Sequence, residues 1–568
     1  MTKSEKIVIV IFILFIISGI IFFHLERFGD ASNYYLMTIS LLKDGDLEFS
    51  QKDFNRIKEN PFSDVPAGTI LIFSNGKYYF GKPYIYALLN VPLFYFIKEK
   101  SFLFVNLFLF FTMVFLSIRY LLKKNSFFRS AVFTIFYFFL SIVPFYILWI
   151  HEEIFNFFIV FIFFYFLLNF KATDKTYYLY LAAVCCGIGS AIKLINSLLI
   201  LPLLLTLVRK NIKIITNFII VMLLPVFIIL GLFYIHTGIL TYFSGDIREM
   251  YYKLDDMPYS NPLYPYKTHG RDVKLDEMVP PVNKSFVIPN IFYFLFGRFT
   301  GILWYFFPLI TILFFYDKRS PLRYHLLCLF ILWVVCLCVG RWYNYYGGVP
   351  LGNRYFHLYP AFIFLVANIR FKKIFTVLVV FACVLILPLY AHPYLHSSMP
   401  YSHTVYFPYN LMPVEKNQLP GLPFWGKPIK PFWWVRYDNT YVQRKAYYSD
   451  IFFFVLDFSG ELRKDSIFIK EKERFKALIE IPEDVSPLFK IVFCPLRNQV
   501  INEDRVASVK VSYNNQHYNV VLENDKEAYL ILRRPDDKPI KRIEKKWYQT
   551  ELNIKPEACD IFLKIITF

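Results

Sequence analysis

The chain has 568 residues, of which 56% are hydrophobic, 21% are aromatic and only 18% are charged. A soluble protein of this size does not carry so much apolar sequence, so the composition indicates a polytopic membrane protein. The formal net charge of +19 does not indicate nucleic-acid binding, because no basic tract with interleaved aromatic residues forms a continuous patch. Lysine and arginine instead gather in the short cytoplasmic loops of membrane proteins.

Apolar segments of about membrane-spanning length recur along the chain, and we expect about eleven transmembrane helices. The predicted spans are residues 7–25, 101–122, 129–149, 153–170, 177–192, 194–208, 213–235, 291–316, 323–339, 353–369 and 373–391. The first is longer than the core of a signal peptide and no small-residue cleavage pattern follows it, so we expect it to stay in the protein. An odd number of crossings puts the two ends of the chain on opposite sides of the membrane.

The basic loops give the orientation. The segments rich in lysine and arginine all fall on one side of this topology, which the positive-inside rule identifies as the cytoplasm; they are residues 123–129, 171–175, 209–213, 317–323 and 370–373. The apolar run at 84–97 is too short for a span, and we expect it to lie on the outer surface. The outer side then carries the loops 26–100 and 236–290, the short loop 151–153 and the turn 340–355.

The sequence changes character after residue 392. A coil rich in proline and aromatic residues leads into short segments of alternating hydrophobicity, such as "FKALIEI" and "ASVKVSY", which are typical of strands. We therefore predict a membrane all-α polytopic bundle over residues 1–392, followed by a small extracytoplasmic β-sandwich domain over residues 393–568.

An acidic residue, Asp30, stands just beyond the first predicted span in the stretch "FGDASNYYLMTISLLKDGDLEF" at 28–49. Such a residue can be an ordinary solvated loop charge. Its neighbours favour a second interpretation. An aromatic pair that includes Tyr34 follows Asp30 and begins an apolar helical segment, and that segment ends at a glycine-containing turn. That arrangement would hold Asp30 at the start of a helix lying along the membrane surface.

Other charged residues also fall at predicted outer helix ends. The stretch "HEE" places His151, Glu152 and Glu153 before a span, where acids either cap the helix or supply a second carboxylate for chemistry. Lys193 interrupts an apolar stretch, which is costly unless the cation is paired or faces a polar cavity. Two arginines, Arg298 and Arg341, could contact a phosphate or anchor the interface.

Three segments resemble the polytopic, lipid-phosphate-sugar-dependent glycosyltransferases of the GT-C class, whose relatives include protein O-mannosyltransferases and lipid A aminoarabinose transferases. The stretch that begins at Asp30 looks like their first outer loop, although Ala31 stands where many members have a second acid. "FGKPYIYALLNVPLFYF" at 80–96 resembles the Lys-Pro element of the family, with Tyr84 in place of its second proline. "GGVPLGNRYFHLYPAF" at 347–362 is similar to a late Gly-x-Arg-Tyr segment.

This resemblance implies an inverting enzyme that moves a hexosyl or pentosyl group from a polyprenyl-phosphate donor to an acceptor. Asp30 would be the base acting on a glycan, lipid or protein acceptor, with Glu152 or Glu153 in support. The resemblance assigns the donor phosphate to Lys82 and Arg354, and we expect Lys193, Arg298 and Arg341 to be further phosphate ligands. We expect Tyr34 and His151 to support the acceptor side, and no metal or other cofactor.

The chemistry asks for the same groups, because the departing phosphate is stabilised by cations and the acceptor hydroxyl must lose a proton. Two other functions stay open: an O-antigen polymerase or ligase, which would depend on the arginines, and a lipid-linked glycan flippase or other transporter. A transporter usually shows repeats and ionisable residues near the middle of the membrane. We expect a bacterial inner or plasma membrane, with the active site and the C-terminal domain outside the cytoplasm.

Overall fold

The structure is a computed structural model. It describes residues 3–26, 30–59, 69–207, 211–242, 247–251, 254, 257–260, 271–272, 284–339, 351–398, 403 and 407–413, and the strands between 452 and 567. The chain divides into two compact units. The first comprises Met1–Phe296 and Thr300–Ser398, and the second comprises Gly297–Phe299 and Met399–Phe568.

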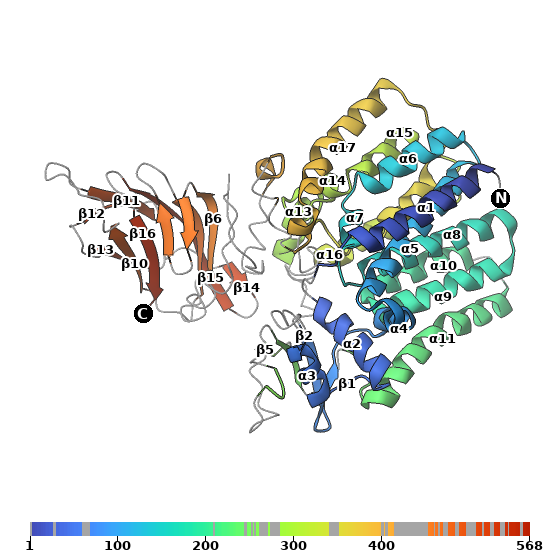
Figure 1. Ribbon diagram of the computed structural model, residues 1–568. Coiled ribbons are helices and arrows are strands. Elements are labelled where there is room, and N and C mark those ends of the chain that lie inside the picture. The colour runs from blue at the N-terminus through green and yellow to red at the C-terminus, as the bar shows by residue number, and fades with distance from the viewer. Residues whose placement is uncertain are drawn as a thin grey trace. The chain divides into compact units, whose positions relative to one another are not determined.

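The first unit is a helical assembly (Figure 1). Five of the helices in the described part of the chain are long and apolar enough to cross a membrane. They are α1 (Lys3–Phe22), α5 (Lys100–Leu121), α8 (Glu153–Thr173), α11 (Ile212–Thr237) and α17 (Lys373–Ala391). Helices α5 and α8 are largely buried, whereas α1 and α11 expose most of their apolar side chains, as expected of helices that face lipid.

The other predicted spans are shorter or interrupted, so the prediction of about eleven full spans is not confirmed. The shorter apolar helices are α4 (Ile85–Ile97), α6 (Phe127–Phe139), α9 (Thr176–Ile192), α10 (Ile200–Leu207) with the preceding 3₁₀ helix η2 (Leu194–Leu199), α13 (Lys284–Phe296) and α16 (Arg323–Val339). The run at 84–97 does form a short helix, α4, as predicted.

Three predicted spans differ most from the observed elements. The segment 129–149 is divided between α6 and α7 (Val143–Tyr146), and 291–316 between the end of α13, α14 (Ile302–Tyr305), η4 (Phe307–Thr311) and α15 (Ile312–Phe315). The prediction of a crossing helix at 353–369 is wrong, since this segment holds only the 3₁₀ helix η5 (Tyr359–Leu365). Proline stands in the first turn of α7, η4 and η5, where it starts a new helix and cannot continue an old one.

Two predicted outer loops meet in one sheet. The loop 26–100 contributes α2 (Ala31–Lys43), α3 (Gln51–Glu59) and the strands β1 (Glu48–Phe49), β2 (Thr69–Ser74) and β3 (Lys77–Phe80). The loop 236–290 contributes β4 (Ile247–Tyr251) and β5 (Arg271–Asp272), and the antiparallel order is β1-β3-β2-β4-β5. Leu71 on β2 pairs with Phe80 on β3 and with Glu249 on β4.

The β2–β3 hairpin has a local explanation. Its two-residue turn is Asn75-Gly76, with φ of 53° and 78°. Asn-Gly is the pair that a type I′ hairpin turn favours, because both of its central residues need positive φ. This turn holds β3 so that the chain runs directly through Lys82 into α4.

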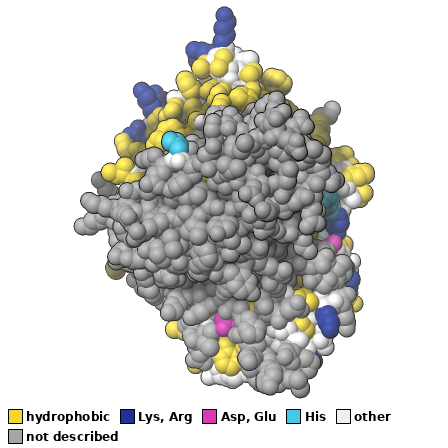
Figure 2. Space-filling view, turned by 90° about the vertical axis from the view of Figure 1, so that its left-hand side faces the viewer, with side chains coloured by type: hydrophobic (Ala, Val, Ile, Leu, Met, Phe, Trp, Pro, Cys, Tyr) yellow, Lys and Arg dark blue, Asp and Glu magenta, His cyan; other side chains and the backbone are white. Residues whose placement is uncertain are grey.

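Basic loops predicted on the cytoplasmic side also meet. Lys124 forms an ion pair with Asp317, and the Ile369 backbone N–H donates to Asn125 Oδ1 at 2.7 Å. These contacts connect two of the five loops that the positive-inside rule placed together, 123–129 and 317–323, with the residue that directly precedes a third, 370–373. Figure 2 shows hydrophobic side chains across the upper part of the molecule, with lysine and arginine side chains at its upper edge.

The second unit consists of antiparallel strands in its C-terminal part. One sheet has the order β13-β10-β16-β8-β7, and the other has the order β12-β11-β15-β9-β6 with β14 paired to β15. The strands are β6 (Phe452–Phe458), β7 (Gly460–Arg463), β8 (Ser466–Ile469), β9 (Phe475–Pro482), β10 (Leu488–Pro495), β11 (Ala507–Tyr513), β12 (Gln516–Leu522), β13 (Ala528–Arg533), β14 (Ile540–Arg542), β15 (Lys545–Pro556) and β16 (Ile561–Thr567). The predicted β structure is therefore present, and its packing as a sandwich stays a prediction.

Candidate functional site

Asp30 and Lys82 form an ion pair at the start of the two helices that follow them. Asp30 directly precedes α2, and Lys82 lies in the link between β3 and α4. Lys82 Nζ donates to Asp30 Oδ2 at 2.6 Å. The two side chains are only 12% and 16% exposed, so the pair is shielded from bulk water but still has an opening to it.

The electrostatic surroundings keep Asp30 ionised. Burial by itself raises the pKa of this carboxyl, but Lys82, His151 and Arg354 together hold the pKa well below its usual range. Side chains from three separate parts of the sequence therefore act on one carboxylate. Asp30 is an acceptor of hydrogen bonds, not a donor, at neutral pH.

Glu152 and Lys193 form a second buried ion pair. Glu152 precedes α8, and Lys193 lies between the end of α9 and η2. Lys193 Nζ is 2.7 Å from Glu152 Oε1 and 5.0 Å from the centre of the Tyr355 ring. The costly cation of the apolar stretch is thus compensated by a carboxylate and an aromatic face, as the sequence argument required.

Glu153 and Arg354 form a third ion pair, and two histidines border it. Glu153 Oε1 lies 3.1 Å from Arg354 Nη1 and 4.0 Å from His151 Nδ1, and Glu153 Oε2 lies 3.7 Å from His357 Nε2. Arg354 Nη1 is also 3.4 Å from His151 Nδ1. All of these side chains are almost fully buried.

His357 belongs to the cluster, although sequence reasoning did not single it out. Asn156 Nδ2 donates to the Glu152 carbonyl at 2.9 Å and Asn196 Nδ2 donates to Asn156 Oδ1 at 2.8 Å, which leaves Asn196 Oδ1 to accept from His357 Nδ1 at 2.9 Å. The proton of a neutral His357 is therefore on Nδ1, and Nε2 faces Glu153. The sequence did contain a signal for this network, because Asn156, Asn196 and His357 are polar residues inside apolar runs.

Aromatic and amide side chains fix the backbone around the three acids. Tyr34 on α2 is buried, with its ring 5.4 Å from Tyr86 and 6.2 Å from His151. Burial, with Glu152 and Asp30 nearby, raises the pKa of Tyr34 well above its usual value. The Tyr86 hydroxyl donates to Asn106 Oδ1 at 2.9 Å, and Asn106 Nδ2 donates to the Trp149 carbonyl at 2.9 Å.

Two predicted phosphate ligands are not placed in this cluster. Arg298 belongs to the second unit, where its Nε donates to the Met412 carbonyl at 3.0 Å and its Nη2 to the Asn410 carbonyl at 2.8 Å. The structure thus gives Arg298 a role in holding the chain segment that contains Met412. Arg341 lies outside the described residues.

The cluster combines three carboxylates and three cations from six positions in the sequence. Its members are Asp30, Lys82, Glu152, Glu153, Lys193 and Arg354, with His151, His357 and Tyr34 against them. Such a site can accept a proton from a hydroxyl and can bind an anion, because carboxylates and cations lie side by side. Within the described residues, no group of three or more His, Cys, Asp or Glu side chains is arranged to hold a metal ion.

Comparison with known proteins found no family whose pattern matches this chain. No curated protein matches it either.

Proposed function

We propose that this protein is an integral membrane glycosyltransferase that moves a sugar from a polyprenyl-phosphate donor to an acceptor on the extracytoplasmic face. The buried cluster carries this proposal, because it combines an ionised, partly accessible acid with three cations. The resemblance of three sequence segments to the GT-C class supports it, since Asp30, Lys82 and Arg354 come from those segments.

The proposed reaction is a single inverting displacement. The oxygen of the acceptor hydroxyl forms a bond with the anomeric carbon, and the bond from that carbon to the phosphate oxygen breaks. The electron pair of the broken bond leaves with the polyprenyl phosphate, and the hydroxyl proton passes to the Asp30 carboxylate. No other reactant is needed, because the phosphate is already a good leaving group.

The cations have a distinct task in this proposal. Lys82 and Lys193 are each 16% exposed at the side chain, which makes them the cations of the cluster that an incoming phosphate reaches first. Arg354 lies deeper, against Glu153 and His151. A phosphate that displaces part of these ion pairs would gain charge-assisted hydrogen bonds and would at the same time release Asp30 from Lys82.

The acids and the tyrosine around Asp30 complete the site. Glu152 and Glu153 hold Lys193 and Arg354 in place, and we assign His151 and Tyr34 to the acceptor side because their ring centres lie 6.2 Å apart, beside Asp30. The proposal places the helical unit as a polytopic domain in a bacterial inner or plasma membrane, with a C-terminal β-sandwich outside the cytoplasm. The five long apolar helices and the antiparallel strands are compatible with it.

The test is sugar transfer by the purified full-length protein in lipid, with a panel of labelled polyprenyl-phosphate sugars. Asp30→Asn is compared with Asp44→Asn, a matched control at the other end of α2 whose carboxylate pairs with Arg56 instead. We expect Asp30→Asn to lose transfer by a factor of about 100 or more, which is the usual contribution of a general base. Asp44→Asn should keep wild-type activity.

Each other result changes the assignment. Equal activity of Asp30→Asn and wild type would remove the base role from Asp30, and the next residues to test are Glu152 and Glu153. A folded wild-type protein that transfers sugar from no donor in the panel would contradict the proposal. The flippase and the O-antigen polymerase or ligase would then be the functions to test.

A further inference from the structure

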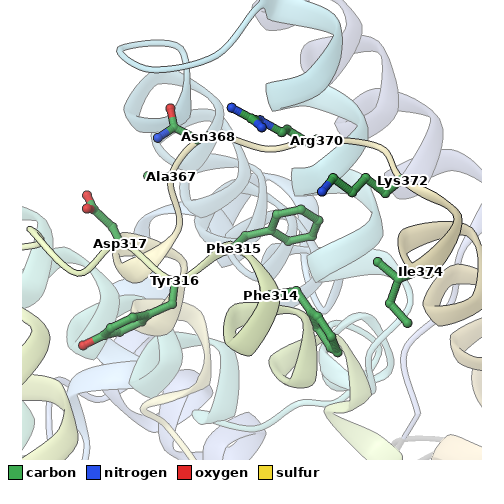
Figure 3. Close-up of a pocket in the computed structure, with 9 residues that line it drawn as sticks. All are labelled: Phe314, Phe315, Tyr316, Asp317, Ala367, Asn368, Arg370, Lys372 and Ile374. Carbon is green, nitrogen blue, oxygen red and sulfur yellow. The ribbon is translucent and has the colours of Figure 1, made fainter.

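A second candidate site lies away from the acid cluster, among the basic loops predicted on the cytoplasmic side. A pocket of about 390 Å³ lies between the end of α15 and the start of α17. Its lining residues are Phe314, Phe315, Tyr316, Asp317, Ala367, Asn368, Arg370, Lys372 and Ile374 (Figure 3).

Backbone hydrogen bonds join the two chain segments that line this pocket. The Asp317 N–H donates to the Leu365 carbonyl at 2.7 Å, and the Ala367 N–H donates to the Phe315 carbonyl at 3.0 Å. These bonds form a bridge between Tyr316 and Val366. The pocket is therefore built on two chain segments that are joined by hydrogen bonds, and not on one loop.

The charge of the pocket is positive. Its one carboxylate, Asp317, is neutralised by Lys124 and also accepts from the Arg319 N–H at 3.0 Å. Arg370 and Lys372 are exposed, and neither side chain has an ion pair or hydrogen bond with another of the described residues. Figure 3 shows both reaching from the same segment over Phe315, with Asp317 at the opposite end of the pocket.

An apolar surface continues from the pocket along the helices. Phe314 and Ile374 line it on the side away from Asp317, and they are 51% and 40% exposed. Beyond them Leu313 on α15 and Val377 on α17 are 79% and 61% exposed. Since α17 is one of the candidate spans, we expect this surface to face hydrocarbon and the cations to stand at the level of the lipid head groups.

We propose that this pocket binds the head group of an anionic phospholipid. Arg370 and Lys372 take the phosphate, and the acyl chains lie on Phe314, Ile374 and the exposed face of α17. A free phosphate would find the same cations, but it would leave the adjoining apolar surface unused. This inference does not rest on the glycosyltransferase proposal, because it involves none of the residues of the acid cluster.

The test uses native mass spectrometry on the full-length protein in detergent. Phosphatidylglycerol and phosphatidylcholine with identical acyl chains are added at equal concentration, and bound lipid is counted. The variant Arg370→Gln/Lys372→Gln is compared with Lys175→Gln/Lys318→Gln, which removes two exposed cations from the same predicted face outside the pocket. A parallel sample contains inorganic phosphate as competitor, and the melting temperature of each variant checks that it is folded.

We expect the wild type to prefer phosphatidylglycerol, and the pocket variant to bind it about 25-fold more weakly, since each of the two lost cations weakens binding about fivefold. The control variant should keep the preference, and inorganic phosphate should not displace the lipid. Equal binding of both lipids by the wild type, or an equal loss in the two variants, would overturn the proposal. Displacement by inorganic phosphate would make this a simple anion site and would overturn the lipid assignment.

Discussion

Asp30 is held in its charged form by its neighbours, and the sign of its effect on stability follows from that. Burial raises the pKa of Asp30, but Lys82 and two further cationic or titratable groups outweigh it, so the folded pKa is below the ordinary value of about 3.9. A carboxyl with a depressed pKa stabilises the folded state by an amount that is complete above the unfolded pKa. That contribution is lost as the pH falls toward the folded pKa.

We therefore predict a constant difference in melting temperature between wild type and Asp30→Asn from pH 8 to about pH 5, and a shrinking difference below about pH 4. In a Lys82→Met background the folded pKa of Asp30 is higher, because the nearest opposing charge is gone, so the stabilising difference at neutral pH should be smaller. It should change sign if burial outweighs the remaining cations. Thermal unfolding in one detergent across this pH range measures both. Asp44→Asn is the control, since Arg56 and not Lys82 lowers the pKa of Asp44.

Lys82→Met should leave the melting-temperature difference caused by Asp44→Asn unchanged at every pH. If Lys82→Met changes the pH dependence of the melting-temperature difference equally for Asp30→Asn and Asp44→Asn, the variant has altered the whole loop and not only the Asp30 pair. If Lys82→Met changes neither pH dependence, Lys82 does not control the charge of Asp30, and the ion pair lacks the predicted electrostatic effect.

The sequence predicted the individual charged residues of the site better than their partners. Asp30, Glu152, Glu153 and Lys193 were singled out from position and residue type, and Lys82 and Arg354 from the resemblance of their segments to the GT-C class. The observed pairs join residues far apart in the chain, such as Asp30 with Lys82 and Glu153 with Arg354. Local sequence patterns do not show which segments lie next to each other in the fold. The three ion pairs of the cluster could therefore not be predicted from them.

His357 and Asn196 show a second limit at this scale. Each lies in a segment that reads as apolar, and a single histidine or asparagine there is more often a satisfied core residue than part of a site. Their hydrogen bonds to each other and to Asn156 become visible only when three elements are packed. Arg298 shows the converse, because an arginine that fitted a phosphate ligand by position donates to backbone carbonyls instead.

Close packing between helices makes a prediction at the scale of elements. A Cβ atom built on Gly187 of α9 would lie 2.2 Å from the Met222 carbonyl oxygen on α11. Gly187→Ala should therefore force the two helices apart, at a cost of about 1–3 kcal/mol in the free energy of unfolding. Gly231→Ala, on α11 itself, meets nothing within 4 Å and should be neutral or gain up to about 1 kcal/mol.

Denaturant unfolding of the two alanine variants beside wild type, in the same detergent, measures this difference. Both substitutions add one methyl group to a helix, so their contrast isolates the effect of the contact. Equal stability of the two variants would show that α9 and α11 are not packed as closely as the distance from Gly187 requires.

Elements were predictable where one physical requirement dominates. Helices α1, α5, α8, α11 and α17 are continuous apolar runs of spanning length, and such runs have no other stable form in lipid. Residues 353–369 have a similar composition, but Pro360 stands at the start of η5, and the segment folds as buried 3₁₀ helix and coil instead. The pairing of β2 with β4 joins two loops that are far apart in the chain, and neither strand contains a signal for the other.

At the scale of the whole molecule, the sidedness of the chain is the prediction on which the proposed function depends. The loops 123–129 and 317–323 come together through Lys124–Asp317. Asn125 binds Ile369, which directly precedes the loop 370–373, and Asp317 lines one pocket with Arg370 and Lys372 of that loop. The loops 26–100 and 236–290 come together in the sheet β1-β3-β2-β4-β5. Each group consists only of loops that the charge rule had placed on the same side, which is the arrangement that an outer active site requires.

Labelling with a membrane-impermeant thiol reagent in intact cells tests this sidedness. The eight native cysteines are first replaced by alanine or serine, and single cysteines are introduced at exposed positions: Lys52 on α3 and His517 in the C-terminal unit for the predicted outside, and Lys175 and Lys318 for the predicted inside. We expect Lys52→Cys and His517→Cys to react in intact cells, and Lys175→Cys and Lys318→Cys to react only after the membrane is permeabilised.

The pattern of labelling separates two kinds of error. If Lys52→Cys reacts from outside and His517→Cys does not, the number of crossings between them is odd, and the C-terminal strands lie away from the acid cluster's side. If Lys318→Cys reacts from outside together with Lys52→Cys, the charge rule has failed for this chain. Asp30, Lys82 and the basic loops would then share one side of the membrane, and the donor and acceptor of the proposed reaction would have to be sought on the side that the label reveals.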